Sequence, residues 1–478
     1  MLQNLPGSPN LHIAIVGAGI GGLTCAIACR RMNNNLKVTV LERSAEVLPL
    51  GTGIHIPPNA ARVLAHLGLL DRVKKEAAGY HMDRFTLHRY EDGQVLADKP
   101  VREKVEREYG SEWIVIHRGD YHTVLLSEAK ELGAEVLTGA EAIGVEKSQQ
   151  NREAVVLKDG RRIEADVVIG ADVRNMANGA VSGLWSSLRE TVLGRPFSPT
   201  ETGDLAYRGT FPRDKLLALG NENLNKIIDQ EDLHVWLGPG RHAVFYPLRD
   251  QTEYNLVLIV ADDLANGVKM APSSLEEMNA HFDGWDPMLR LTWPNHASLK
   301  DIISCQNTPL KWKLLHFESL DKWTKGPIAL LGDATHPTLP YQGQGAAMAV
   351  EDAAVLSLLL ARSLEKGLPA GPVEKREYLS GLLRLYQDLR KRRTETNVAG
   401  AVHTQHYYHL ADGEEQRRRD AELAGLAGTG WQGTCSFNWG DAEYQRSLLG
   451  FDVIADSREK FEEWWVSYQK AGAMDGLF

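Results

Sequence analysis

The chain has 478 residues, of which 43% are hydrophobic and 24% charged, a mixture typical of soluble globular proteins that disfavours intrinsic disorder. At roughly 100–200 residues per domain, this length has room for two to four domains. The chain carries 53 Lys and Arg against 63 Asp and Glu, and the resulting net charge of −10 argues against a nucleic-acid-binding protein, which would need a basic surface.

Cysteine and hydropathy patterns exclude further classes. The 4 cysteines are too few for a disulfide framework and none lies in a CxxC pair, so neither a disulfide scaffold nor a zinc site is predicted. No stretch approaches the ~20 apolar residues of a membrane span. Met1–Pro9 has no basic segment before an apolar run, as a signal peptide would. We therefore expect a cytoplasmic, soluble protein with no metal ion and no membrane or nucleic-acid partner.

The first forty residues predict a nucleotide-binding βαβ unit. Residues 11–16 (LHIAIV) form a short, apolar run that is typical of a buried parallel strand. Residues 17–22 (GAGIGG) match G-x-G-x-x-G, and a helical segment follows to about residue 32. A second strand over residues 37–41 ends at Glu42. A glycine-rich turn alone is weak evidence, but the complete unit predicts dinucleotide binding.

Each of these positions has a physical role in such a unit. Gly17 permits the tight turn, Gly19 lets the backbone approach a pyrophosphate, and Gly22 lets the helix pack closely on the strand. The helix N-terminus offers unpaired N–H groups to the phosphates. Glu42 can accept hydrogen bonds from an adenosine ribose. Because this unit serves both NAD and FAD, an NAD-dependent dehydrogenase stays an alternative at this point.

The remaining chain mixes parallel and antiparallel patterns. Residues 165–170 and 328–331 are short apolar runs typical of buried parallel strands. From about residue 200 to 260, short alternating runs separated by Gly, Pro or polar turns predict a separate antiparallel sheet inserted into the chain. After Gly345 the pattern is mostly helical. We therefore predict an α/β fold.

A second, longer motif begins after the strand at 328–331. It runs Gly332-Asp333-Ala334-Thr335-His336-Pro337, continues through Gly343 and Gly345, and opens a helix at Ala346. This block resembles the second FAD motif of the flavoprotein aromatic hydroxylases, the group A flavoprotein monooxygenases with the para-hydroxybenzoate hydroxylase fold. The two motifs and Arg118 follow in the family's order. The resemblance covers roughly residues 10–400 and looks closest to fungal salicylate hydroxylase-like monooxygenases, whose C-terminal tails resemble Tyr408–Gly413.

The resemblance implies a Rossmann-like FAD-binding domain with an inserted β-sheet substrate domain and a helical C-terminal region. The implied boundaries are residues 1–80, 111–195 and 305–362 for the FAD-binding domain, 81–110 and 196–304 for the substrate-binding β-sheet domain, and 363–478 for the C-terminal helical region.

The same resemblance implies the FAD site. Asp333 would accept hydrogen bonds from the ribityl hydroxyls, although it could also be a helix N-cap only. Arg118 would contact the ribityl–phosphate region, and the bare backbone at Gly343 and Gly345 would let a helix N-terminus point at the flavin pyrimidine edge. The complete set of cofactor-binding residues is Gly17, Gly19, Gly22, Glu42, Arg43, Gly53, Arg118, Asp172, Asp333, Gly343, Gly345 and Ala346.

Four residues are candidates for the reaction itself. Arg208 and Tyr246 come from the inserted sheet, which in the resemblance forms one wall of the substrate cavity; they would bind a carboxylate or phenolate. The alternative is a salt bridge on the sheet and an ordinary packed tyrosine. His336 and Pro337 would flank the isoalloxazine, with a turn as the alternative for His336. His55 could lie near the flavin, but a structural histidine is the favoured interpretation.

One departure from the family concerns Asp172. The family places Asp-Gly after a strand, with Ser and Arg shortly afterwards, but here residues 173–182 separate Asp172 from Gly183–Arg189. The segment is either a surface loop or retained non-coding sequence. In the family this motif serves both FAD and NAD(P)H, so the interruption bears on reduction by the nicotinamide. If the segment is an intrusion, we predict that deleting residues 173–182 preserves or improves FAD binding.

The resemblance implies an FAD-dependent monooxygenase that hydroxylates a small aromatic or phenolic substrate with O₂ and either NADPH or NADH. With an ortho or para carboxylate on the substrate, hydroxylation can proceed with decarboxylation. We expect a monomer or homodimer. The alternatives are a flavin-dependent epoxidase of an isoprenoid, for which membrane helices would be expected, and a non-catalytic flavoprotein scaffold.

Overall fold

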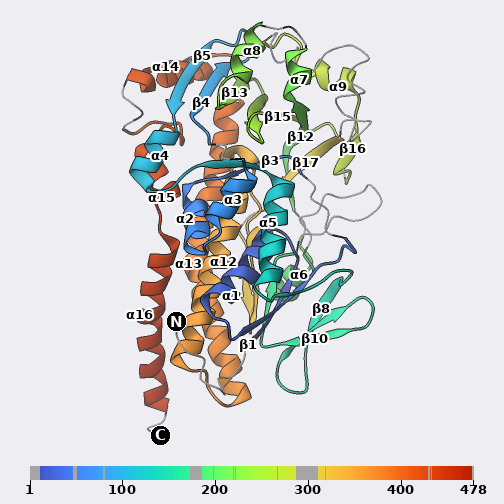
Figure 1. The fold of residues 1–478 in the computed structure, drawn as a ribbon, viewed down its shortest axis with the longest axis vertical. Coiled ribbons are helices and arrows are strands. Elements are labelled where there is room, and N and C mark those ends of the chain that lie inside the picture. Colours follow the sequence, from blue (N-terminus) through green and yellow to red (C-terminus); the bar gives the residue numbers. More distant parts are fainter. Residues whose placement is uncertain are drawn as a thin grey trace.

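The computed structural model describes residues 11–475 except for 47–50, 79–80, 173–185, 287–309, 429–430 and the single positions 198, 219, 221, 266, 318 and 432. In outline, a large antiparallel sheet lies at one end of a set of long helices, and a Rossmann-like layer lies alongside these helices (Figure 1). The prediction of an α/β fold with an inserted sheet and a helical C-terminal region is confirmed.

The Rossmann-like layer is a six-stranded sheet whose central strands are parallel. Its strands β1, β2 and β11 are buried almost throughout, because helices cover both of its faces. In sheet order, the strands are β18 (Thr324–Lys325), β19 (Ile328–Leu330), β11 (Val167–Gly170), β1 (Leu11–Val16), β2 (Leu36–Leu41) and β7 (Glu135–Leu137). Segments from three distant parts of the chain therefore meet in one sheet, as the order of the two motifs predicts.

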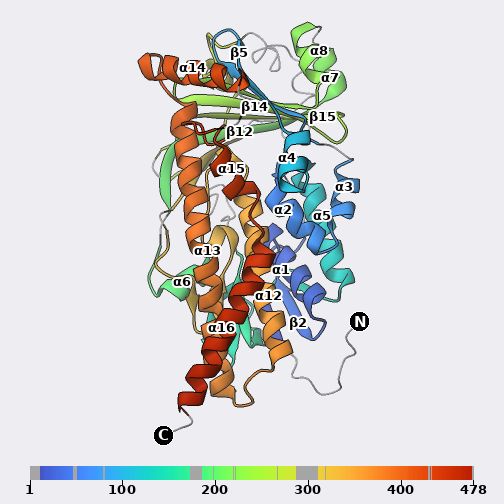
Figure 2. The same cartoon turned by 90° about the vertical axis from the view of Figure 1, so that its left-hand side faces the viewer.

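The large sheet has eight strands and is antiparallel apart from the pairing of β13 with β4. Figure 2 shows it lying across one end of the long helices. Its strands, in sheet order, are β16 (Met270–Pro272), β17 (Leu310–His316), β12 (Thr200–Pro212), β15 (Glu253–Ala261), β14 (Arg241–Leu248), β13 (Asp232–Gly238), β4 (Arg84–Arg89) and β5 (Val95–Pro100). The predicted domain boundaries stay a prediction, but β17 belongs to this sheet although the sequence placed residues 305–362 with the cofactor domain.

Two small sheets complete the strand inventory of the described residues. The first joins β8 (Ala142–Lys147), β9 (Glu153–Leu157) and β10 (Arg162–Ala165) beside the Rossmann-like layer. The second pairs β3 (Gly53–Ile56) with β6 (Ile114–His117), and it lies between the two large sheets (Figure 1). This small ribbon carries His55 and leads directly into Arg118.

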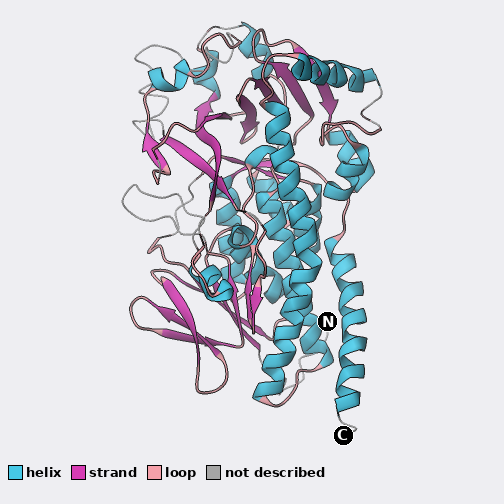
Figure 3. Cartoon of the chain, turned by 180° about the vertical axis from the view of Figure 1, so that it is seen from behind, coloured by secondary structure: helices cyan, strands magenta, loops and turns pink. Residues whose placement is uncertain are grey.

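The helices fall into two groups. Shorter helices border the sheets: α1 (Ile20–Met32), α2 (Pro58–His66), α3 (Leu70–Glu76), α4 (Arg102–Tyr109), α5 (Arg118–Glu131), α6 (Ser187–Leu193), α7 (Arg213–Leu217), α8 (Glu222–Ile228) and α9 (Leu275–Ala280). The C-terminal part of the chain is formed by α12 (Gly345–Lys366), α13 (Pro372–Tyr408), α14 (Glu414–Gly428), α15 (Ala442–Leu449) and α16 (Val453–Asp475). Figure 3 shows the long helices lying side by side along the long axis of the molecule; α13, with 37 residues, is the longest of those described.

Helix α12 is the central element of this packing. It is buried along most of its length and packs against both α1 and α16. Its two buried acids are neutralised from α13, because Arg390 donates to both Glu351 and Asp352, and Arg393 donates to Glu351. These pairs fix the position of the α12 N-terminus, which faces the cavity described below. Within the described residues, no helix is long and apolar enough to span a bilayer.

Candidate functional site

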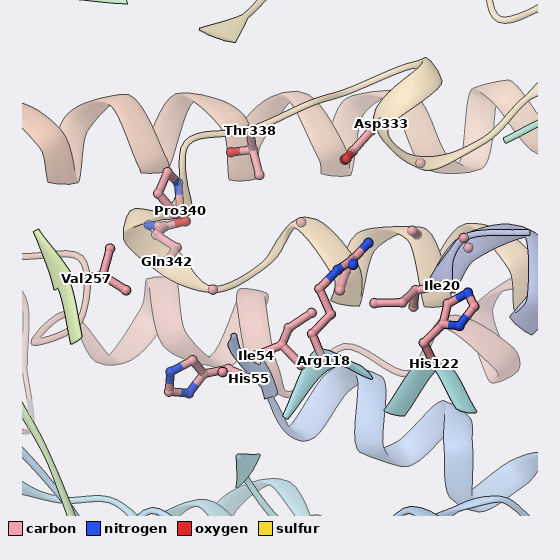
Figure 4. A pocket seen from close by; sticks show the side chains of 18 of the residues that line it. Ile20, Ile54, His55, Arg118, His122, Val257, Asp333, Thr338, Pro340 and Gln342 are labelled. Atoms are coloured by element: carbon pink, nitrogen blue, oxygen red, sulfur yellow. The ribbon is translucent and has the colours of Figure 1, made fainter. Parts of the chain in front are cut away.

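A continuous cavity of about 860 Å³ lies between the Rossmann-like layer and the eight-stranded sheet. Residues from both sheets, from the β3–β6 ribbon and from the α12 N-terminus line it (Figure 4). The cavity wall includes eleven of the twelve predicted cofactor residues: Gly17, Gly19, Glu42, Arg43, Gly53, Arg118, Asp172, Asp333, Gly343, Gly345 and Ala346. Arg208 and Tyr246 line it as well. The structure thus brings together two motifs that are about three hundred residues apart.

The glycine turn leaves room for a ligand at the start of α1. Gly17 has a φ of +105°, and a Cβ there would lie 2.6 Å from the carbonyl oxygen of Ala171. A Cβ on Gly22 would lie 2.0 Å from the Gly17 carbonyl oxygen, so Gly22 acts in helix packing and does not line the cavity. Gly19, by contrast, borders open space, and no side chain caps α1. The first N–H groups of α1 are therefore available to a phosphate.

Glu42 lies at the C-terminal end of β2, beside this turn. Its carboxylate accepts hydrogen bonds from the backbone N–H groups of Ala18, at 3.0 Å, and of Ser44, at 2.9 Å. It therefore orients the glycine turn and also lines the cavity, where it can accept from a ribose hydroxyl.

Asp333 and Arg118 face the middle of the cavity. Figure 4 shows their side chains reaching into it from opposite walls. The Asp333 carboxylate makes no hydrogen bond or ion pair within the described part of the chain, and its surface is accessible from the cavity. Burial raises the pKa of Asp333, and the charges of His336, Arg118 and Arg189 partly oppose this shift. An unpaired acceptor facing the cavity suits a polyhydroxylated ligand chain.

Asp172 contacts the start of helix α6, whose N-cap is Ser186, across the predicted interruption. Its carboxylate accepts hydrogen bonds from the Ser186 hydroxyl at 2.6 Å and from the backbone N–H of Ser187 at 3.0 Å. Burial raises the pKa of Asp172, and these hydrogen bonds oppose that shift. Residues 173–182 themselves lie outside the described residues. The two parts of the family motif are nevertheless in contact here.

Arg189, at the end of the displaced motif segment, was not assigned a role from the sequence. Its side chain is buried, and it donates to the backbone carbonyls of Ala334 at 2.8 Å and Asp333 at 3.0 Å. It thereby ties the Asp172 segment to the second motif. Its position shortly after Ser187 was the available signal, because the family pattern contains an Arg there.

Arg208 and Tyr246 approach the cavity from the same face of the eight-stranded sheet. Arg208 pairs with Val257 and Tyr246 with Asn255, two residues along the same strand, so both side chains point the same way. The Arg208 guanidinium has no hydrogen-bond or ion-pair partner among the described residues. Burial lowers the pKa of Arg208, an effect that Tyr246 opposes and Arg118 increases, but a guanidinium keeps its charge at neutral pH. The salt bridge considered as the alternative for Arg208 is absent from the described structure.

The Tyr246 side chain packs on the backbone of β3. A Cβ on Gly53 would lie 2.5 Å from the Tyr246 hydroxyl oxygen, which explains the glycine. Burial raises the pKa of Tyr246, with Arg208 partly opposing the shift, so the hydroxyl stays protonated and can donate a hydrogen bond.

His55 lines the cavity and is also held by its neighbours, so its role near the flavin stays a prediction. Its ring lies 4.8 Å from that of Tyr246, and its Nδ1 accepts from the Trp113 indole N–H at 3.2 Å. With Nδ1 as the acceptor, Nε2 carries the proton. Burial lowers the pKa of His55 to about 4, so the ring is neutral at pH 7. It lines the cavity as a neutral donor.

His336 and Pro337 are placed differently. Neither is among the residues that line the cavity. The Nε2 atom of His336 lies 2.5 Å from the Asp352 carboxylate, which also accepts from the backbone N–H of Gly332. His336 therefore holds the second motif against α12, and a structural role accounts for it better than proton transfer. That the pair flanks the isoalloxazine stays a prediction.

Comparison with known proteins decides the family. A family described as "FAD binding domain" matches residues 10–191 and 303–371, which together form more than half of the chain. The chain is also 33% identical to the FAD-dependent monooxygenase OpS4 of Beauveria bassiana (strain ARSEF 2860), over 93% of this chain and 96% of that protein. This protein belongs to the FAD-dependent aromatic hydroxylases.

Two further comparisons agree. The hydroxylase is 31% identical to 6-hydroxynicotinate 3-monooxygenase of Pseudomonas fluorescens, over 74% of this chain and 83% of that enzyme. Its fold superimposes on that of a salicylate hydroxylase substrate complex with a TM-score of 0.71 at 22% identity, covering 95% of this chain and 98% of the other. At 22% identity, the likeness to the salicylate hydroxylase structure shows a shared fold and nothing further.

The residues in the cavity fit FAD. The uncapped α1 N-terminus suits a pyrophosphate, Asp333 offers an unpaired acceptor to the ribityl hydroxyls, and the α12 N-terminus at Gly345 faces the far part of the cavity. The hydroxylase is an oxidoreductase that uses FAD, with NAD(P)H as the co-substrate typical of this class.

Proposed function

We propose that this monooxygenase hydroxylates a phenolic or carboxylated aromatic ring whose anionic group binds Arg208. The observation that carries this proposal is the position of a guanidinium deep in the cavity with no anionic partner in the described structure. The Arg208 side chain is accessible from the cavity, so an anionic ligand can reach it and form a charge-assisted pair there. The carboxylated or hydroxylated substrates in the names of several relatives support the same chemistry.

Arg208, Tyr246 and His55 each have a separate role in binding the substrate. The guanidinium binds a carboxylate or phenolate and, for a phenol, favours the ionised form, whose ring is richer in electrons. The Tyr246 hydroxyl donates to an oxygen of the same ring. His55 offers a second neutral donor on the cofactor side, because it lies on β3 beside Gly343.

When bound, FAD supplies the transfer of one oxygen atom from O₂ after its reduction by NAD(P)H. The chain contributes position and exclusion of water. Apolar walls from Val257 and Ile259 keep the ring in a dry part of the cavity. With a carboxylate ortho or para to the reacting hydroxyl, the same arrangement supports replacement of the carboxylate by a hydroxyl, with loss of CO₂.

A substrate screen tests the proposal. The purified holoenzyme is incubated with NADH or NADPH and a panel of hydroxybenzoates, aminohydroxybenzoates and uncharged phenol ethers. We expect acidic or phenolic members to stimulate NAD(P)H oxidation and to give a product with one added oxygen atom. We expect no stimulation by the ethers. Turnover that favours uncharged ethers over acids would contradict the proposal.

Arg208→Gln provides the residue-specific arm of the same experiment. Losing a charge-assisted pair in a buried site should weaken binding by about 2–3 kcal/mol, and KM should rise roughly 30- to 150-fold. FAD content, measured by absorbance, should not change, because the sheet wall of the cavity is not a predicted part of the cofactor site.

A further inference from the structure

The cavity extends well beyond Arg208 along one face of the eight-stranded sheet. Arg208 on β12 is followed, strand by strand, by Val257 on β15, Val244 on β14 and Val235 on β13. A second row of side chains on the same face runs from Tyr246 on β14 across Leu233 on β13. It continues to Phe85 on β4 and Lys99 on β5, because Leu233 pairs with Phe85 and Phe85 pairs with Lys99. Side chains directly opposite each other on paired strands share a face. With strands about 4.8 Å apart, β12 and β5 are separated by roughly 24 Å.

Apolar side chains occupy this face between its two charged ends. We call them the apolar strip: Val257, Val244, Val235, Leu233 and Phe85, all of which line the cavity. Three of them, Val257, Val244 and Phe85, are only partly buried although other elements cover this side of the sheet. Their accessible surface therefore faces the cavity and not bulk solvent.

The wall opposite the strip is also apolar. It is built from Val101 and Val105 around α4, from Trp113 before β6, and from Trp439 and Leu449 in the C-terminal region. The sheet face and this wall line the apolar arm of the cavity that leads from Arg208 toward β4 and β5, and at its far end the Phe85 ring lies 6.3 Å from that of Trp439.

Lys99 lies at the far end of the apolar arm. Its Nζ donates to the backbone carbonyl of Trp439 at 2.7 Å and to the side-chain oxygen of Gln445 at 2.5 Å. No carboxylate pairs with it in the described residues. Nζ also lies over the Trp431 ring, 5.5 Å from its centroid, and burial lowers the pKa of Lys99 well below its usual value. Lys99 therefore marks the polar end of the cavity beyond the apolar strip.

We propose that the natural substrate is an aromatic acid or phenol that carries a long apolar substituent, with the ring anchored at Arg208 and the substituent lying along the apolar strip toward Lys99. This inference rests on the proposed function, because it uses Arg208 as the anchor of the ring. A single-ring acid fills only the end of the apolar arm next to β12, whereas an extended chain covers the exposed apolar surface of the strip. Burial of that surface is the gain that selects the longer substrate.

Binding of a homologous series tests the inference directly. The holoenzyme is titrated by calorimetry with salicylate and with 6-alkylsalicylates carrying butyl, hexyl and octyl chains. We expect Kd to fall about two- to fourfold for each added methylene, as burial of apolar chain predicts. A Kd that does not fall with chain length would contradict the inference, as would a failure of every member to bind.

Substitutions within the strip give a second readout. Val235→Phe and, separately, Val244→Phe narrow the apolar arm beyond the ring. Each should weaken binding of the octyl homologue at least tenfold while Kd for salicylate changes less than twofold. The matched control is Val95→Phe on β5, where the side chain is 52% exposed and outside the cavity; it should leave both values unchanged. Equal weakening of the short and long ligands by the strip variants would overturn the proposal.

The Arg208→Gln variant separates this inference from the function on which it rests. If Arg208→Gln weakens every member of the series equally and the dependence on chain length persists, both statements are supported. If Arg208→Gln leaves the affinity unchanged while Kd still depends on chain length, Arg208 does not anchor the ring. The binding of the substituent along the apolar strip is then still supported. If Arg208→Gln weakens binding but chain length has no effect, the proposed function stands and the extended substrate is wrong.

Discussion

At the scale of single residues, the cavity is defined by groups that lack partners inside the described structure. The Arg208 guanidinium, the Asp333 carboxylate and the Tyr246 hydroxyl all face open space at depth. In a folded protein such groups are usually paired. Two lie on the eight-stranded sheet and one on the second motif, and we propose that each binds a different group of the ligands.

Tyr246 allows a test with little change in packing. Tyr246→Phe removes one hydroxyl and keeps the ring on the Gly53 backbone, so we expect kcat/KM to fall about tenfold with stability unchanged. The control is Tyr207→Phe, one residue before Arg208 in β12 and on the opposite face, where the hydroxyl lies 3.3 Å from that of Ser273. That variant should leave kcat/KM unchanged. Similar kinetic losses in both variants would show that Tyr246 acts through the sheet and not on the substrate.

Residue roles were the least predictable part of the site. From the sequence, Arg208 could either form a salt bridge on the sheet or bind a substrate. The pairing of β12 with β15 and β17 was needed to see that no carboxylate of the described residues pairs with it. His336 sits inside a motif, yet its bond to Asp352 depends on the helix that follows. His55 gave no local signal, because its neighbours Trp113 and Tyr246 come from two other strands.

At the scale of elements, the two nucleotide-binding motifs were predictable because each is local. Strand, turn, helix and acid follow one another within residues 11–42, and the observed β1, α1 and β2 lie where the pattern predicts them. The contacts between distant segments were not predictable. Strand β17 joins the large sheet, and Arg189 links α6 to Gly332–Ala334, through pairings that no short window of sequence contains.

The hydrogen bonds of Asp172 make the prediction for deletion of residues 173–182 more specific. Asp172 is hydrogen-bonded to Ser186 and Ser187, so the ends of the intervening chain are close together. After the deletion, residues 183–185 would still connect them, and three residues span up to about 10 Å. We expect the shortened protein to keep FAD with a Kd within about threefold of the full chain, measured by fluorescence titration.

The Asp172→Ala variant is the control for that deletion. It keeps the segment but removes the hydrogen bonds that Asp172 accepts from Ser186 and Ser187 at the start of α6, which should destabilise the protein by about 1–2 kcal/mol. If the deletion released FAD while Asp172→Ala retained it, the segment itself would be part of the cofactor site, and the idea of an intrusion would be wrong.

At the scale of the whole molecule, the closed interior makes stability dependent on pH. Burial lowers the pKa of His55 and of His409 to about 4 each, with Arg241 adding to the shift of His409. The unfolded chain binds protons at these histidines near pH 6.5, so between pH 6.5 and 4 it holds more protons than the folded state. Stability therefore falls as pH is lowered through this window.

For these two histidines together, the free energy of unfolding should decrease by roughly 4 kcal/mol between pH 7 and pH 5. Urea denaturation at a series of pH values measures this change. His409→Gln should remove about half of it, whereas His403→Gln, at an exposed position on α13, should remove none. An unchanged pH dependence in His409→Gln would show that other groups control acid stability.

The central claim is that an anionic aromatic ring binds at Arg208 and is oxygenated there. The most direct measurement follows NAD(P)H oxidation by the holoenzyme with a phenolic acid under isotopically labelled dioxygen, with mass spectrometry of the product. We predict one labelled oxygen atom in the product of the wild-type protein, and a kcat/KM for Arg208→Gln that is lower by roughly 30- to 150-fold with FAD still bound. Labelled product formed equally well by Arg208→Gln, or NAD(P)H oxidation that never labels the substrate, would contradict the account.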